Sequence, residues 1–211
     1  MIYSLFTDMS RCTSDEVQRL LSLVSEEQRV EALKFKHTFG QFTTLKSLLM
    51  LKELLVENHL VPSADPLRFG YNSHGKPHLA DFTDIHFNIS HCPNAIAVAI
   101  DDAPIGVDVE RFVMPSDSLL SYCMNDNEAQ QVRQSAQPER TFASFWTQKE
   151  ALFKQRGTGI THELREVLAH PHPDIILETK VFDEQQFAFT IATASRKCYS
   201  SLMVKSRSAN L

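Results

Sequence analysis

The clearest hydrophobic pattern in the chain lies between Phe39 and His59, where apolar residues recur at steps of three and four. This spacing predicts one long helix that buries a broad face. Upstream, residues 2–7 alternate between apolar and polar positions as a strand does. Two shorter helices are expected to follow, because Thr13 and Ser25 each open a sequence with capping-box spacing.

Short β-like runs replace the helical periodicity between Leu67 and Glu110. The runs cover residues 67–71, 85–90, 95–101 and 105–110, and Gly, Pro, Asn and Asp separate them. Their connections are too short for helical crossovers, which favours antiparallel pairing.

The second half of the chain repeats this mixture of helices and strands. Helical segments are expected at residues 117–124, 126–134 and 138–155, and strands at 175–182, 187–194 and 197–204. We therefore expect an α+β fold of two similar lobes, each a small, mostly antiparallel sheet packed with helices and related by pseudo-twofold symmetry. The predicted boundary gives an N-terminal lobe of residues 1–103 and a C-terminal lobe of residues 104–211.

Composition narrows the function classes. The 211 residues are 43% hydrophobic and carry a net charge of -5, which fits a globular protein and gives no sign of nucleic-acid binding. The four cysteines lack the spacing of a zinc site, and no secretory signal suggests a disulfide framework. No apolar run reaches the length of a membrane span, so we expect a soluble, cytoplasmic protein.

Two carboxylates share one side of the predicted strand at 105–110. Asp108 and Glu110 are two positions apart, so both project from the same face, while Val107 and Val109 fill the other. Mg²⁺ prefers such oxygen ligands together with waters and substrate phosphates. A plain solvent-facing strand is the alternative for this pair taken alone.

A second charged cluster lies on the predicted helix at 138–155. Trp146, Glu150 and Lys154 are spaced at i, i+4 and i+8 and so share one face. A Glu and Lys pair at this spacing is also what an ordinary surface helix uses for stabilisation. The pair gains functional weight only when it is considered together with Asp108 and Glu110.

Two further motifs precede these clusters. Ser90 and His91 end a predicted strand and offer a hydroxyl and a titratable ring that can hold a phosphate. Gly75, Lys76 and Pro77 form a tight turn whose Lys can reach a nucleotide, although the sequence is not a Walker loop.

In this order, the motifs resemble those of the Sfp-type 4′-phosphopantetheinyl transferases, which move phosphopantetheine from coenzyme A onto a serine of a carrier protein. The resemblance covers most of the chain. The matching stretches are Gly75-Lys76-Pro77, Phe87-Asn88-Ile89-Ser90-His91, residues 105–110, residues 145–154 and Gly157-Thr158-Gly159.

The resemblance implies a role for each motif residue. Asp108, Glu110 and Glu150 would be the Mg²⁺ ligands, with Glu150 also the general base and Lys154 facing the leaving group. The residues implied in coenzyme A binding are Ser90 and His91 at the phosphates, Gly75, Lys76 and Pro77 at the adenine side, and Thr44 at the 3′-phosphate.

One departure from the family pattern concerns the basic grip on the 3′-phosphate. Gln28, Glu31 and Thr43 stand where the family usually has Lys or Arg. Possible substitutes are Lys34 together with Arg29, Lys36, His37 and Lys46. We therefore expect weaker or rearranged coenzyme A binding.

The expected partners are coenzyme A and an apo acyl or peptidyl carrier of fatty acid, polyketide or nonribosomal peptide synthesis. By resemblance, the carrier would dock on the C-terminal lobe after Glu110, and the enzyme would work as a monomer. The alternatives are a catalytically weak descendant that binds coenzyme A or a carrier as a regulator, and an unrelated Mg²⁺-dependent nucleotide hydrolase.

Overall fold

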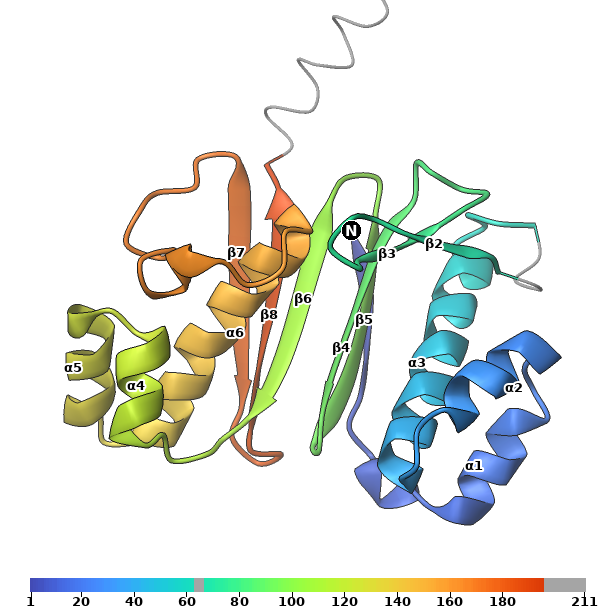
Figure 1. Cartoon of the computed structure of the whole chain (residues 1–211), viewed down its shortest axis with the longest axis horizontal. Coiled ribbons are helices and arrows are strands. Elements are labelled where there is room, and N and C mark those ends of the chain that lie inside the picture. The colour runs from blue at the N-terminus through green and yellow to red at the C-terminus, as the bar shows by residue number, and fades with distance from the viewer. Residues whose placement is uncertain (63–66, 196–211) are drawn as a thin grey trace, which may run out of the picture.

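Two three-stranded antiparallel sheets occupy the centre of the molecule, and helices cover them on both sides (Figure 1). The structure is a computed structural model that describes residues 1–62 and 67–195. The strand expected at 197–204 lies outside the described residues. The predicted α+β class, with small antiparallel sheets packed with helices, is confirmed.

The first sheet is built from the N-terminal half of the chain and has the strand order β1-β5-β4. Its strands are β1 (Ile2–Phe6), β4 (His86–Cys92) and β5 (Ala95–Asp101). Its helices are α1 (Ser14–Leu21), α2 (Glu26–Leu33) and α3 (Thr38–Glu57), with a short 3₁₀ turn at Met9–Arg11. A two-stranded hairpin of β2 (Phe69–Tyr71) and β3 (Pro77–Leu79) follows α3.

The second sheet comes from the C-terminal half and has the order β6-β8-β7. Its strands are β6 (Ile105–Arg111), β7 (Ile175–Phe182) and β8 (Phe187–Ala194). The helices are α4 (Asp117–Cys123), α5 (Asp126–Gln134) and α6 (Pro138–Arg156), followed by a 3₁₀ helix, η2 (His162–Arg165). Figure 1 shows α1 to α3 on one side of the two sheets and α4 to α6 on the other.

Local sequence signals set several of these boundaries. The Thr13 side chain accepts a hydrogen bond from the Glu16 amide at the start of α1, and Ser25 forms a full capping box with Gln28 at the start of α2. At its other end, α6 stops at Gly157, which has a positive φ of 69° that Gly adopts without a steric penalty.

The buried apolar residues of the described chain form three clusters, the third of them among α4, α5, α6 and η2. Leucines and Phe42 of α3 pack on the outer face of the first sheet, and a second cluster lies where the two sheets meet. In that second cluster, Ala95, Ala97 and Ala99 of β5 contact larger apolar residues of β6 and β8. The small β5 side chains allow the sheets to approach each other, which brings the edge strands β4 and β6 together.

The sequence patterns located nearly all of these elements, including strands 175–182 and 187–194 with the bounds found in the structure. They missed β3, which has only three residues and begins at a proline. Such a strand gives no alternation to detect, and proline is depleted in strands.

Within residues 1–62 and 67–195, no helix combines the length and apolar character needed to cross a membrane.

Gly106 marks the closest approach between β6 and α6. A Cβ atom at this position would lie 2.1 Å from the Ala151 carbonyl oxygen and 2.3 Å from the Gln155 amide nitrogen. Both neighbours are backbone atoms of a helix, so neither can move aside independently. The absence of a side chain at Gly106 therefore sets how close α6 lies to the strand that carries Asp108.

Gly106→Ala is expected to destabilise the protein by roughly 1–3 kcal/mol or more, because the added methyl group overpacks the contact with α6. Urea unfolding monitored by the fluorescence of Trp146, the single tryptophan, measures this change. A free energy of unfolding within about 0.5 kcal/mol of the wild type, as for an ordinary surface substitution, would contradict the prediction.

Candidate functional site

The candidate site lies where β4 and β6 meet below α6. Ser90, on β4, donates a hydrogen bond to Asp108 Oδ1 at 2.8 Å. The same hydroxyl oxygen accepts from the Val109 amide at 3.3 Å and from Lys154 Nζ at 3.0 Å. Ser90 thus links all three elements that carry the predicted site residues.

Lys154 supplies a positive charge at the centre of this site. Its Nζ forms an ion pair with Asp108 Oδ1 at 2.6 Å, and the Asp108 side chain is only 7% exposed. The second oxygen of this carboxylate, Oδ2, is buried and has no hydrogen-bond partner within the described residues. Asp108 therefore keeps one unused acceptor beside Lys154.

The predicted carboxylates influence one another electrostatically. Burial, and then the charge of Asp108, raises the pKa of Glu110. Burial raises the pKa of Glu150, and the charges of Asp108 and Glu110 raise it further against the opposite effect of Lys154. Burial also raises the pKa of Asp108, although Lys154 and Ser90 oppose this shift. A positive ligand that approached this group would relieve the repulsion.

The carboxylate oxygens of Asp108, Glu110 and Glu150 are chemically suited to bind a hard divalent cation. Carboxylate oxygens that repel one another, one of them a buried oxygen without a partner, are the ligands that Mg²⁺ accepts. Their present arrangement is not a closed cage, because no three His, Cys, Asp or Glu side chains in the described ranges are grouped closely enough to hold a metal ion. Lys154 provides the compensating charge instead.

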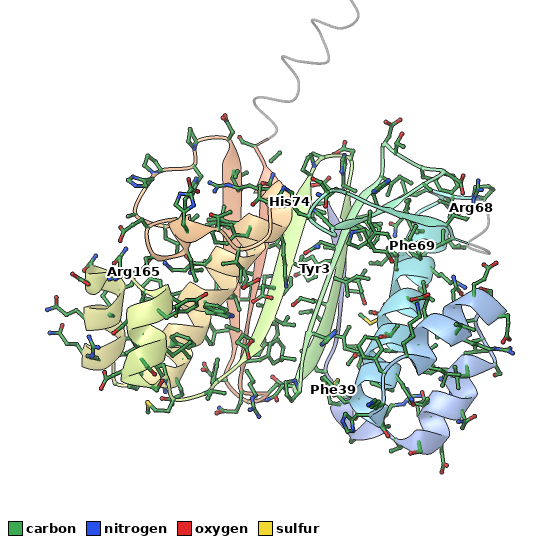
Figure 2. The ribbon with its side chains drawn as sticks, in the orientation of Figure 1. Tyr3, Phe39, Arg68, Phe69, His74 and Arg165 are labelled. Atoms are coloured by element: carbon green, nitrogen blue, oxygen red, sulfur yellow. The ribbon has the colours of Figure 1, made fainter. Side chains whose placement is uncertain are left out.

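His91 lies beside the site at the end of β4. Its ring is solvent-exposed on one side and packs edge-on against Phe39 of α3, with 5.7 Å between the ring centroids. Figure 2 shows Phe39 close to the ends of α3 and β4. Desolvation of the ring, together with the charge of Lys154, lowers the pKa of His91. The ring is therefore favoured in its neutral form until an anion arrives.

The turn of the β2–β3 hairpin contacts the C-terminal end of α6. Lys76 Nζ donates to the carbonyl oxygens of Ile105 at 2.8 Å, Lys154 at 2.6 Å and Gln155 at 3.4 Å. Two of these carbonyls belong to the last turn of α6, where backbone acceptors have no partner within the helix. The ammonium group of Lys76 thus holds α6 against β6, and its contact with a nucleotide stays a prediction.

Asn72 shapes the same turn and extends the contact. Its Oδ1 accepts from the backbone amides of His74 and Lys76, and its Nδ2 donates to the Gly157 carbonyl at 2.9 Å. In Figure 2, His74 lies next to the C-terminal part of α6. We call Asn72 and Lys76 the hairpin latch, because together they join the hairpin to the end of α6.

A cavity of about 280 Å³ opens between the hairpin latch and the predicted catalytic residues. Gly75, Lys76, Pro77, Glu150 and Lys154 line it, together with Asn88 and the loop after α6. A larger hollow of about 820 Å³ lies among α5, η2 and β7 and contains none of the predicted site residues. The smaller cavity thus lies between the Gly-Lys-Pro turn and the Glu150 and Lys154 side chains of α6.

The residues that were considered on the N-terminal helices lie apart from the contacts among Ser90, Asp108 and Lys154. Gln28 and Thr43, two positions where a basic grip was expected, are buried and hydrogen-bonded inside the helical layer. Thr44 is half-buried on α3, and Lys34 is exposed and paired with Glu31. Whether Thr44 and Lys34 contact a ligand stays a prediction.

Sequence reasoning missed several residues that organise the site. Asn72 lies outside the matched motifs, and Asn88 lies within the stretch of residues 87–91 but was given no role there. Lys149 was given no role either, yet its side chain is 0% exposed and pairs with Glu128 of α5 at 2.8 Å. Lys149 also donates to the carbonyls of Leu164 and Arg165, so it joins α5, α6 and η2.

Comparisons with known proteins found similarity to 4′-phosphopantetheinyl transferases. A family model described as the 4′-phosphopantetheinyl transferase superfamily matches residues 104–200. The 4′-phosphopantetheinyl transferase ffp of Bacillus subtilis is 30% identical over 175 residues, which cover 82% of this chain and 77% of that protein. The 4′-phosphopantetheinyl transferase Sfp of Bacillus subtilis (strain 168) is 28% identical with the same coverage. AcpT of Salmonella typhi is 36% identical over 94 residues, 41% of this chain and 48% of that protein.

Lys76→Met is expected to destabilise the protein at neutral pH by roughly 1–3 kcal/mol, because buried carbonyls at the end of α6 lose their donor. The loss should depend on pH. Burial lowers the pKa of Lys76 to about 8 from its ordinary value of 10.5. Between these values the unfolded chain keeps a proton that the folded chain has released, so stability rises with pH.

Urea unfolding of both proteins at several pH values from 7.5 to 10.5 checks this prediction. The wild type should gain stability relative to Lys76→Met as the pH rises through this window. A constant difference between the two proteins would show that the Lys76 amine is solvated.

Proposed function

Because the chain belongs to the Sfp-type 4′-phosphopantetheinyl transferases, we propose that it moves 4′-phosphopantetheine from coenzyme A to a serine of an apo carrier protein and releases 3′,5′-ADP. Coenzyme A is the donor substrate, and an acyl or peptidyl carrier is the acceptor. We further propose a cytoplasmic enzyme that works as a monomer, since one chain supplies both sides of the site.

The contact of Lys154 with Asp108 and Ser90 is the observation that carries this proposal. It joins the Ser-His motif of β4, the acidic motif of β6 and the Lys of α6, which are separated by 18 to 64 positions along the chain. A regulator that only binds coenzyme A has no need for a buried carboxylate with a spare oxygen beside a lysine. The intact group favours an enzyme.

Asp108, Glu110 and Glu150 would hold Mg²⁺, as the chemistry of the three carboxylates allows. When bound, the ion would act as a Lewis acid on the diphosphate of coenzyme A. Lys154, which contacts Asp108 Oδ1, would provide positive charge at the leaving phosphate. Preorganised positive charge at a leaving group is usually a large catalytic term.

Glu150 is proposed as the general base that takes the proton of the carrier serine, directly or through water. Its raised pKa is physically useful here, because a base acts best when its pKa lies nearer the working pH. The serine oxygen forms a bond to the β-phosphorus, the bond from that phosphorus to the bridging oxygen breaks, and 3′,5′-ADP leaves. No covalent enzyme intermediate is required.

We propose the segment after β6 as the carrier-docking surface. Its exposed apolar side chains are Val113 at 43%, Met114 at 64%, Leu119 at 37% and Tyr122 at 67%. Leu120 and Met124, in the same segment, are buried in the core. Nearby Arg165 is bonded to Asp126 and to the Met124 carbonyl, so it is only partly free to attract an acidic carrier.

Intact-mass analysis of apo carriers incubated with the protein, coenzyme A and Mg²⁺ tests the proposed function. We expect a gain of one phosphopantetheine on the carrier and none on a carrier whose acceptor serine is replaced by alanine. Coenzyme A binding without any mass gain would favour the regulator. Breakdown of coenzyme A without a carrier would favour a hydrolase.

Glu150→Gln is expected to lower kcat by about a hundredfold or more, because it removes the proposed base. It should not lower the unfolding temperature, since the raised pKa of Glu150 means that its charge is unfavourable in the folded protein. The rise in unfolding temperature caused by added Mg²⁺ should become smaller. Glu139→Gln, in the first turn of the same helix, is the matched control. Full turnover in Glu150→Gln would remove this residue from the catalytic role.

A further inference from the structure

Strands β4 and β6 meet as two sheet edges without a backbone ladder between them. Strand β4 is an edge strand of the sheet with the order β1-β5-β4, and β6 is an edge strand of the sheet with the order β6-β8-β7. The outward amides of β6 are satisfied by side chains of β4: the Val107 amide donates to Asn88 Oδ1 at 2.8 Å, and the Val109 amide donates to Ser90 Oγ at 3.3 Å. Asn88 therefore acts as a substitute for a neighbouring strand.

This contact fixes the orientation of the Asn88 amide. A backbone N–H can only donate, so the side-chain atom that receives it must be the carbonyl oxygen. The NH₂ group then points away from β6. Within the described part of the chain, no hydrogen-bond partner of Asn88 Nδ2 is present, and this nitrogen is not sealed from solvent.

The free amide group belongs to the candidate cavity. Asn88 is 6% exposed, and it lines the same 280 Å³ space as Glu150, Lys154 and the turn at Lys76. Ser90, two positions further along β4, has its hydroxyl engaged by Asp108, Lys154 and the Val109 amide. Asn88 thus keeps a spare donor on this face of β4, next to the engaged hydroxyl of Ser90.

We propose that Asn88 is a substrate-binding residue that donates from Nδ2 to a diphosphate oxygen of coenzyme A, while its Oδ1 holds β6. This inference rests on the proposed function. A ligand that fills the cavity removes water from the amide, so the ligand atom opposite Nδ2 must be an acceptor. The diphosphate is the acceptor-rich part of coenzyme A that must lie near Glu150 and Lys154 for transfer to occur.

Asn88→Asp separates the two roles of this side chain. The aspartate keeps an oxygen for the Val107 amide, and it replaces the NH₂ group with an oxygen that repels phosphate. Isothermal titration calorimetry with Mg²⁺ should show at least tenfold weaker binding of coenzyme A. The same loss with 3′-dephospho-coenzyme A would assign the contact to the diphosphate and not to the 3′-phosphate.

Asn94→Asp is the matched control, because Asn94 Nδ2 also donates between the two halves, to the Gln185 carbonyl, but lies outside the cavity. It should bind coenzyme A as the wild type does. If Asn88→Asp does not fold, Asn88→Ser keeps a hydroxyl acceptor without the amide donor or a new charge, and it should also bind more weakly.

Binding of coenzyme A within twofold of the wild type in the folded Asn88 variant would overturn the inference. So would a loss seen with coenzyme A and absent with 3′-dephospho-coenzyme A. A wild type that binds coenzyme A but modifies no carrier would defeat the proposed function and leave the Asn88 result interpretable. A wild type that binds no coenzyme A would defeat both.

Discussion

The junction between β4 and β6 is the constraint on which the site depends. Two sheet edges face each other there, and an exposed edge leaves a row of unpaired backbone groups. Asn88 and Ser90 satisfy the β6 amides with side-chain oxygens, so the two halves of the chain are joined without a continuous sheet. This junction places Asp108 directly against Ser90 and within reach of Lys154. The hydrogen bonds that join the two halves are thus also the bonds that bring the candidate site residues together.

Helix α6 is positioned from three directions, and each contact uses a different kind of interaction. Gly106 lets β6 touch the helix backbone, and Lys76 donates to the carbonyls at its C-terminal end. Lys149 joins it to α5 and η2 through a buried ion pair with Glu128. A buried ion pair contributes little net stability compared with apolar packing, so its value here is the fixed position it gives to the helix. Glu150 follows Lys149 directly in the sequence, so the contacts that fix Lys149 also fix the backbone that carries Glu150.

Charge interactions among Asp108, Glu110, Glu150 and Lys154 set the electrostatic balance of the site. Asp108 is buried, and its charge opposes the ionisation of Glu110 and Glu150. The ammonium of Lys154 offsets part of this repulsion through its ion pair with Asp108. Lys154 is thus already engaged by Asp108, so the role proposed for it at the leaving phosphate requires that this contact be exchanged.

By itself, the sequence determined the helices, most strands and which side chains share one face of an element. The leucine spacing of α3, the Ser25 cap and the alternation that puts Asp108 and Glu110 on one side all act over a few residues. Only the tertiary structure decided that Lys76 turns inward and that Asn88 serves β6, because these partners lie 19 to 79 positions away. Short-range rules fix which way a side chain points from its own element. What it meets there depends on how the two halves pack, and no local pattern encodes that.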